Sequence, residues 1–247
     1  MMLTKILAIM SIFSIFGLHA APKYATDTIE TPDGTQVRIT FFGHASLAME
    51  VNGRHIYVDP VAEFADYAKL PKADLVVVTH SHYDHLDRAA IDDVTTRQSA
   101  IICDKTSAEA FDYECTVMTP GMKAQPFEWL TVEARPAYNI SEGHTQFHPR
   151  EREDCAYLLT VGGLRIYIPG DTEDTDELLA MRDVDILMLP VNQPYTMTVE
   201  QAVRAVKAIK PAVFYPIHFG QVDQKTDIDS LCRQLEGVTE VRIRPME

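Results

Sequence analysis

The chain has 247 residues, enough to bury the core of one domain or of two small ones. Apolar residues make up 46% of it and charged residues 23%, an ordinary balance for a globular protein. The formal net charge of -14 provides no basic surface for a polyanion, so a nucleic-acid substrate is disfavoured.

The first 21 residues differ from the rest of the chain and indicate a secretory signal peptide at 1–21. Lys5 is their only charge, residues 6–18 are almost entirely apolar, and two alanines follow before Pro22, in the order of a charged start, an apolar run and a cleavage site. The run is shorter than the roughly 20 apolar residues that span a bilayer, although an uncleaved membrane anchor is the alternative. We therefore expect an exported protein, periplasmic or secreted, whose mature domain at 22–247 is not inserted in a membrane.

Short runs of β-branched and apolar residues, each followed by a polar cluster, predict strands through most of the mature chain. The predicted strands are 37–42, 46–51, 55–58, 75–79, 156–161, 164–168, 185–189 and 212–215. Asn52-Gly53 and Gly162-Gly163 predict two hairpin turns. The run 75–79 is apolar up to its last residue, which is typical of a strand that is covered on both faces.

Three segments predict helices. Thr198 and Gln201 form a capping box, after which apolar residues repeat at helical spacing as far as Pro211. Residues 173–181 and 227–236 are the other two predicted helices. Strands in both halves of the chain with helices between them predict one domain of two packed sheets with helices outside.

The four cysteines have spacings that match no zinc-knuckle or redox motif. They are Cys103, Cys115, Cys155 and Cys232. Export would permit disulfides, and the favoured bridge is the one between Cys103 and Cys115, near the ends of two apolar segments. Small buried thiols without a bridge are the alternative.

The segment from His80 to His85 carries the clearest chemical pattern in the sequence. Three histidines and one aspartate, at His80, His82, Asp84 and His85, stand directly after the predicted strand 75–79. Because side chains alternate along an extended chain, His80 and His82 point the same way, whereas Asp84 and His85 come where the chain must turn and can reach a second point. Imidazoles and carboxylates are the ligands that zinc favours. The segment therefore predicts a metal site, with a histidine-rich surface loop as the alternative.

This His-x-His-x-Asp-His pattern resembles the signature of the metallo-β-lactamase superfamily. Phe-Gly-His-Ala-Ser at 42–46 and Ile-Tyr-Val-Asp-Pro at 56–60 resemble the opening of the branch that contains ascorbate-phosphate lactonases and the N-acyl-phosphatidylethanolamine phospholipase D type. Pro-Gly-Asp-Thr at 169–172 resembles the motif of the bridging aspartate, and Tyr-Pro-Ile-His-Phe-Gly at 215–220 that of the last histidine ligand. The resemblance covers roughly 37–220 and implies an α+β, four-layer αββα sandwich with two mixed or antiparallel sheets.

The resemblance also implies a pair of divalent metal ions, with zinc expected first and manganese or iron as alternatives. His80 and His82 would bind the first ion together with one further histidine. The second ion would be bound by Asp84, His85 and His218. Asp171 would bridge the two ions. Without the resemblance, Asp171 would be interpreted as the N-cap of the helix 173–181 and His218 as a hydrogen-bonded core histidine.

The third histidine of the first ion is where the sequence departs from the family pattern. Relatives carry it in a Pro-Ala-x-His stretch, but here Pro136-Ala137-Tyr138 is followed by Asn139. Two histidines follow, and His148, restrained by the proline after it and close to the strand 156–161, is favoured over His144. Asn139 or a water molecule is the remaining possibility.

Two further residues are candidates for catalysis. Asp84 could orient the attacking nucleophile while it coordinates a metal. His44, in a glycine-histidine turn, could orient the ligands or touch the substrate, and Asp59 at the end of a predicted strand could do the same; ordinary turn and capping roles are the alternatives. The loop 192–197 follows a buried strand, so Asn192 or Tyr195 could contact the substrate.

The expected function is hydrolysis of a small ester, lactone or phosphoester by a metal-bound hydroxide. Two metal ions can lower the pKa of water from about 16 to about 7, so no serine or cysteine nucleophile is required. The alternatives are an amide hydrolase of the β-lactamase type and a non-catalytic exported metal- or ligand-binding protein, which the departure at Asn139 favours. An RNA-processing nuclease is disfavoured by the leader and the acidity.

Overall fold

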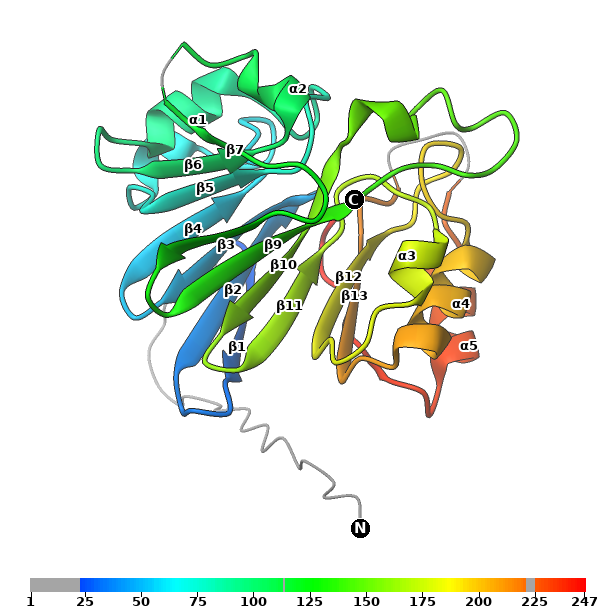
Figure 1. Ribbon diagram of the computed structural model, residues 1–247. Helices are drawn as coiled ribbons and strands as arrows, with labels where there is room; N and C mark the ends of the chain where they lie inside the picture. Colours follow the sequence, from blue (N-terminus) through cyan, green and yellow to red (C-terminus); the bar gives the residue numbers. More distant parts are fainter. Residues whose placement is uncertain (1–22, 113, 221–224) are drawn as a thin grey trace.

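The computed structural model describes residues 23–112, 114–220 and 225–247 (Figure 1). The predicted signal peptide at 1–21 lies outside the described residues. No helix within the described ranges has the length and apolar character that crossing a bilayer requires. All four cysteines are free thiols, so no bridge joins Cys103 to Cys115.

The strands of the described residues form two sheets of seven strands each. The first sheet runs in chain order through β1 (Ala25–Glu30), β2 (Gln36–Gly43), β3 (Ser46–Val51), β4 (Arg54–Val58), β5 (Leu75–Val78), β6 (Ala100–Cys103) and β7 (Thr116–Val117). The second sheet runs likewise through β8 (Lys123–Phe127), β9 (Leu130–Pro136), β10 (Cys155–Val161), β11 (Leu164–Ile168), β12 (Ile186–Pro190), β13 (Val213–Ile217) and β14 (Glu240–Val241).

Both sheets have the same topology. In the first, β1 to β4 form an antiparallel meander, and β5, β6 and β7 continue it in parallel. In the second, β8 to β11 are antiparallel, and β12, β13 and β14 follow in parallel. Each half of the chain therefore changes from hairpins to crossover connections at the same point, and the crossovers carry the helices.

The helices lie on the outer faces of the two sheets (Figure 1). They are α1 (Arg88–Val94), α2 (Lys105–Ala108), α3 (Asp176–Leu179), α4 (Val199–Ile209) and α5 (Ile228–Leu235), with 3-10 turns η1 (Tyr67–Lys69) and η2 (Arg150–Arg152). Ile91 and Val94 of α1 pack on the first sheet, while Val206 of α4 and Leu231 of α5 pack on the second. The predicted four-layer αββα sandwich is confirmed.

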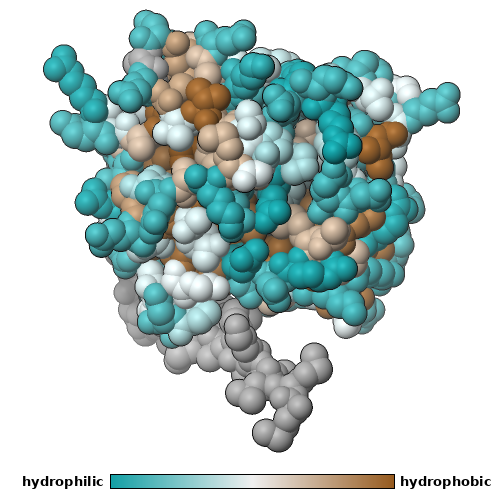
Figure 2. Space-filling view, in the orientation of Figure 1, coloured by the Kyte–Doolittle hydropathy of each residue, from teal (hydrophilic) through white to brown (hydrophobic). Residues whose placement is uncertain are grey.

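The largest core lies between the two sheets. Its members come from the inward faces of both sheets and include Phe41, Leu47, Met49, Tyr157, Leu159, Ile166, Met188 and Tyr215. Burial of each such side chain contributes roughly 1.5–3 kcal/mol, so this layer holds the sheets face to face. On the face shown in Figure 2 the surface is largely hydrophilic, with apolar side chains in small separate groups.

Local signals in the sequence agree with the structure where they involve turns and caps. Asn52 and Gly53 have φ angles of 52° and 72°, as a two-residue hairpin turn requires. Thr198 caps α4, and the capping box with Gln201 is formed. These features depend on neighbouring residues alone, which is why the sequence predicts them correctly.

The predicted helix 173–181 is wrong in its extent, because α3 contains only Asp176–Leu179 and begins after Thr175 as its N-cap. The four preceding residues are buried and held by tertiary contacts. Glu173 accepts hydrogen bonds from the backbone of residues 140 and 141, and Asp174 pairs with Arg204. Asp171 is therefore not a helix cap.

The chain leaves both sheets toward one edge at the points where the chemical motifs occur. β5 ends just before Thr79 and His80, and β11 ends three residues before Asp171. β13 ends directly before His218, and the turn between β2 and β3 holds His44. The packing of the two sheets thus brings four separate segments together at this edge.

Candidate metal centre

The first group of ligand atoms combines both halves of the chain. It contains His80, His82, His148 and Asp171, whose ligand atoms all lie within 4.8 Å of one another. His148 Nε2 lies 3.2 Å from His82 Nδ1 and 3.2 Å from Asp171 Oδ2. His80 Nε2 lies 3.9 Å from the same carboxylate oxygen.

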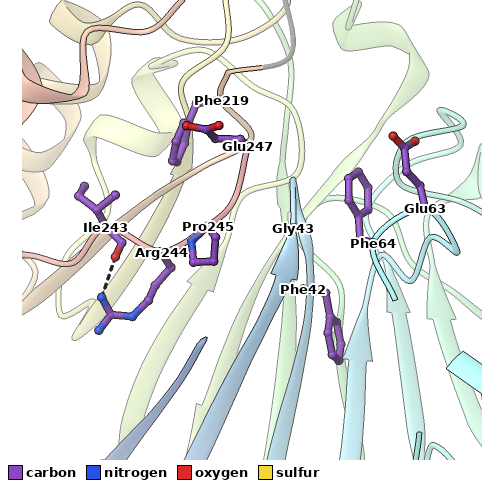
Figure 3. A pocket seen from close by; sticks show the side chains of 9 residues that line it. All are labelled: Phe42, Gly43, Glu63, Phe64, Phe219, Ile243, Arg244, Pro245 and Glu247. Atoms are coloured by element: carbon purple, nitrogen blue, oxygen red, sulfur yellow. Dashed lines mark hydrogen bonds between the residues drawn. The ribbon is translucent and has the colours of Figure 1, made fainter. Parts of the chain in front are cut away.

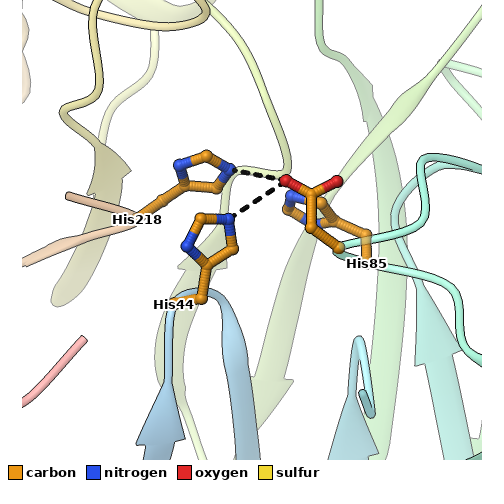
Figure 4. Close-up of side chains that lie close together, drawn as sticks. His44, His85 and His218 are labelled. Atoms are coloured by element: carbon orange, nitrogen blue, oxygen red, sulfur yellow. Dashed lines mark hydrogen bonds and ion pairs between the residues drawn. The ribbon is translucent and has the colours of Figure 1, made fainter. Parts of the chain in front are cut away.

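The second group contains His44, Asp84, His85 and His218, again with all ligand atoms within 4.8 Å. His44 and His218 both point toward one oxygen of Asp84 (Figure 4), with Nε2 distances of 3.1 and 3.6 Å. His85 Nε2 and His218 Nε2 lie 3.2 and 3.3 Å from Asp171 Oδ1. Asp171 therefore faces the first group with Oδ2 and the second with Oδ1.

Several atoms that face this space are buried and make no hydrogen bond. They are His80 Nε2, His85 Nε2, His218 Nε2 and Asp171 Oδ1. A buried polar atom without a partner costs about 1–3 kcal/mol, so four of them at one point are expensive unless a ligand satisfies them. Imidazole nitrogens and a carboxylate oxygen that converge in this way fit divalent cations.

Oxygen acceptors behind three of the rings orient their Nε2 atoms toward the centre. His85 Nδ1 donates to Asp59 Oδ2 at 2.8 Å, and His148 Nδ1 donates to the Tyr195 carbonyl at 3.2 Å. The Thr79 hydroxyl donates to Asp59 at 2.7 Å and can therefore accept from His80 Nδ1 at 3.1 Å. In each ring the proton on Nδ1 leaves the Nε2 lone pair free for a cation.

Burial and charge set the protonation of the imidazoles. Burial lowers the pKa of His80 well below its ordinary value and lowers that of His82 to about 4. Burial acts in the same direction on His85 and His218, but the negative charge of Asp171 outweighs it and raises both pKa values. The space between Asp171 and these two rings thus attracts positive charge.

The two carboxylates remain ionised. Burial alone would raise the pKa of Asp84, but the close contacts with His218 and His44 outweigh it and lower the pKa. Burial also opposes ionisation of Asp171, yet the charges of His218 and His85 hold its pKa well below the usual range. Burial lowers the pKa of His44 to about 4, so this ring is neutral at pH 7. Cations bind ionised carboxylates and neutral imidazoles, so a cation bound here would displace the second proton of His85 and His218.

Of the three candidates for the third position of the first group, the structure brings His148 to the centre. His144 lies outside it, with Nδ1 3.4 Å from Glu173 Oε1. The Asn139 amide donates to the Tyr195 carbonyl at 2.7 Å, and its backbone N–H donates to the carbonyl of His148 at 2.9 Å. Asn139 thus shapes the loop that carries His148.

His44 belongs to the centre through its backbone as well as its ring. Its φ is 55°, and those of His218 and Asp59 are 52° and 44°, so three residues here adopt the left-handed conformation that non-glycine residues rarely use. The His44 carbonyl accepts the His218 N–H at 2.8 Å. Phe64 stacks on the His44 ring with a centroid distance of 5.5 Å.

Sequence reasoning missed three residues around the centre: Phe64, Glu173 and Arg152. Phe64 lies in a loop, Glu173 was assigned to a helix, and Arg152 lies close to His82 only because of the fold. Asp59, whose role was left open, accepts hydrogen bonds from His85 and Thr79.

Figure 3 shows the nine residues that line a pocket of about 690 Å³. Its lining includes Gly43 and Phe219, the chain neighbours of His44 and His218, and also Phe64. The other lining residues are Phe42, Glu63, Ile243, Arg244, Pro245 and Glu247. The pocket therefore combines the aromatic rings of Phe42, Phe64 and Phe219 with the charged groups of Glu63, Arg244 and Glu247.

Comparison with known proteins identifies the family. A family model described as a beta-lactamase superfamily domain matches residues 38–218. A UPF0173 metal-dependent hydrolase of Carboxydothermus hydrogenoformans is 32% identical over 197 residues, which cover 74% of this chain and 84% of that protein.

Solved structures agree with this match. A protein of Parabacteroides distasonis described as a metal-dependent hydrolase is 41% identical, with a TM-score of 0.86, and the match covers 91% of this chain and all of that one. Igni18, a metallo hydrolase of Ignicoccus hospitalis, is 25% identical with a TM-score of 0.71, over 85% of this chain and 96% of its own. The chain therefore belongs to the beta-lactamase superfamily, as its motifs predict, in a group whose named members are metal-dependent hydrolases.

Proposed function

We propose that the protein is an exported hydrolase that holds two divalent metal ions, zinc first among them, and acts on a small ester, lactone or phosphoester. The position of Asp171 carries this proposal. Its two oxygens face two separate ligand groups, at 3.2 Å from His148 and 3.2 Å from His85. A carboxylate shared in this way suits a dinuclear site, and the names of the relatives support metal-dependent hydrolysis.

The residues of the chain divide the work of such a site between them. Two bound divalent cations supply a strong nucleophile at neutral pH and stabilise the negative charge that develops on the substrate. The ionised Asp84, held by His44 and His218, can accept a hydrogen bond from the attacking water and orient it. His44 then acts as a positioning residue for Asp84.

The surroundings of the centre favour a small substrate with an apolar portion. Tyr83, Ile140 and Tyr195 are exposed large side chains on the loops that surround the ligands. The pocket lined by Phe64 and Phe219 lies next to His44 and His218. Such apolar surface can bind the body of an ester or lactone beside the reacting bond.

The test is metal analysis followed by a substrate panel. We expect elemental analysis of the purified protein to give about two divalent ions per chain, and lactones or phosphodiesters to be hydrolysed in preference to β-lactams. Asp171→Asn should lose both metal and turnover. A sample that binds no ion, even on titration with zinc, manganese or iron, would contradict the proposal. Full metal content without any turnover would instead favour a binding protein.

Export needs a test of its own. If the leader at 1–21 is removed, the mature protein recovered from the periplasm or the medium should begin at residue 21 or 22. Mass spectrometry of the intact protein decides this, and an unprocessed chain in the cytoplasmic fraction would contradict export.

A further inference from the structure

Within the first ligand group, His82 differs from His80 and His148 in what lies behind its ring. His80 and His148 each have an oxygen acceptor there. His82 turns Nδ1 toward His148 and the centre, and its Nε2 lies 2.7 Å from Arg152 Nη1. A guanidinium can only donate hydrogen bonds, so His82 Nε2 must be the acceptor of this pair.

That contact is incompatible with coordination by His82. An imidazole whose Nδ1 gives its lone pair to a cation carries its proton on Nε2, and an N–H group there cannot accept from Arg152. Two N–H groups would then face each other. Arg152 Nη1 therefore needs a different acceptor whenever His82 serves as a ligand.

The rest of the Arg152 side chain stays anchored beside the centre. Nη2 donates to the Ser81 hydroxyl at 3.1 Å, and Nε donates to Asp154 Oδ1 at 3.2 Å. Asp154 is buried, and the Arg152 side chain is 24% exposed, so part of this side chain is reachable from solvent. These two hydrogen bonds keep the Arg152 guanidinium beside the first ligand group when its contact with His82 is lost.

Arg152 places a positive charge in direct contact with a member of the first ligand group, at His82. The chain as a whole carries a formal charge of -14, so an anionic substrate needs local positive charge to approach. A guanidinium matches the paired oxygens of a carboxylate or phosphate in both charge and geometry.

We infer that Arg152 binds an anionic oxygen group of the substrate, a phosphate or a carboxylate, next to the reacting bond. The inference rests on the proposed function of the same site and names its substrate class. Arg152 is a specificity-determining residue in this view, and the metal-binding residues do not depend on it.

Binding of simple anions to the metal-loaded protein tests the inference without turnover. Calorimetric titration with inorganic phosphate, and separately with succinate, shows which oxygen group is preferred. Arg152→Gln should lower the affinity for the favoured anion by about tenfold or more, and Arg152→Lys should restore part of this affinity. The matched control is Arg150→Gln on the same turn, whose guanidinium pairs with Glu177 at 2.7 Å, and it should leave anion binding unchanged.

The metal content of each variant separates a specific loss of anion binding from damage to the metal site. We expect Arg152→Gln to keep the metal stoichiometry of the unaltered protein. Equal anion affinity in the two proteins, loss of metal from Arg152→Gln, or an equal loss of anion binding in Arg150→Gln would each overturn the inference. If the protein hydrolyses none of the substrates but still binds anions through Arg152, the inference about Arg152 stands and the proposed hydrolysis is contradicted.

Discussion

His148 Nε2 lies 3.2 Å from His82 Nδ1, although 66 positions separate the two residues in the sequence. His82 follows a strand of the first sheet, and His148 comes from a loop before β10 of the second sheet. The first ligand group therefore exists only when the two sheets are packed, and metal binding should stabilise that packing.

Replacement of His148 tests this relationship. His148→Ala should lower the metal content by about one ion per chain and reduce kcat/KM, because the first group loses an imidazole at its centre. His144→Ala is the matched control, since His144 pairs with Glu173 outside the groups, and it should keep both ions. Elemental analysis of both variants gives the answer, and unchanged occupancy in His148→Ala would remove it from the ligand set.

Replacement of His44 separates positioning from coordination. His44→Asn should keep both ions but lower kcat by about 10–100-fold, because Asp84 loses the ring that holds its oxygen at 3.1 Å. His55→Asn, on β4, is the matched control and should retain full activity. Loss of one ion from His44→Asn would show instead that His44 is a ligand, and an unchanged rate would leave it as a turn residue.

The Phe64 ring, which stacks on His44, leaves no room for a side chain at Gly43. A Cβ at this position would lie 2.7 Å from Phe64 Cδ1, and the φ of 153° is unfavourable for other residues. Gly43→Ala should therefore lower the free energy of unfolding by about 1–3 kcal/mol and reduce activity. Gly34→Ala also has a positive φ but meets no atom within 4 Å, so urea unfolding of the two variants separates the clash from backbone strain. An equal loss of unfolding free energy in the two variants would show that the clash with Phe64 contributes nothing.

Asp27 should make stability depend on pH in the acid range. Burial opposes its ionisation, but hydrogen bonds with Arg244 and Tyr215 outweigh this and lower its pKa. Because the folded pKa lies below the unfolded value of about 3.9, the stabilisation is complete above that value and is lost as the pH falls through the folded pKa.

Asp27→Asn should therefore destabilise the protein at pH 7 by about 1–2 kcal/mol, with a smaller effect near pH 3. The matched control Asp93→Asn, at an exposed position of α1, should change little at either pH. Urea unfolding of the three proteins at both pH values provides the comparison. A difference that stays constant with pH would show that the Asp27 charge contributes nothing.

The sequence by itself determined the features that neighbouring residues control. The spacing of His80, His82, Asp84 and His85 after an apolar run needs no distant contact, and the same holds for the hairpin glycines and the capping box of α4. Six strands, β1, β6, β7, β8, β9 and β14, were not predicted. Four of them, β1, β7, β8 and β14, form the edges of the sheets, where the chain is partly exposed and lacks a continuous apolar run.

Only the tertiary structure decided which distant groups meet. His148, and not His144, lies next to His82, and Arg152 contacts the other side of the His82 ring. The two oxygens of Asp171 face different ligand groups. The tertiary structure also shortened the predicted helix 173–181, because Glu173 and Asp174 bind other segments. The reason is physical: a local pattern fixes which side chains leave a strand together, but the distance between two loops depends on how the sheets that carry them pack.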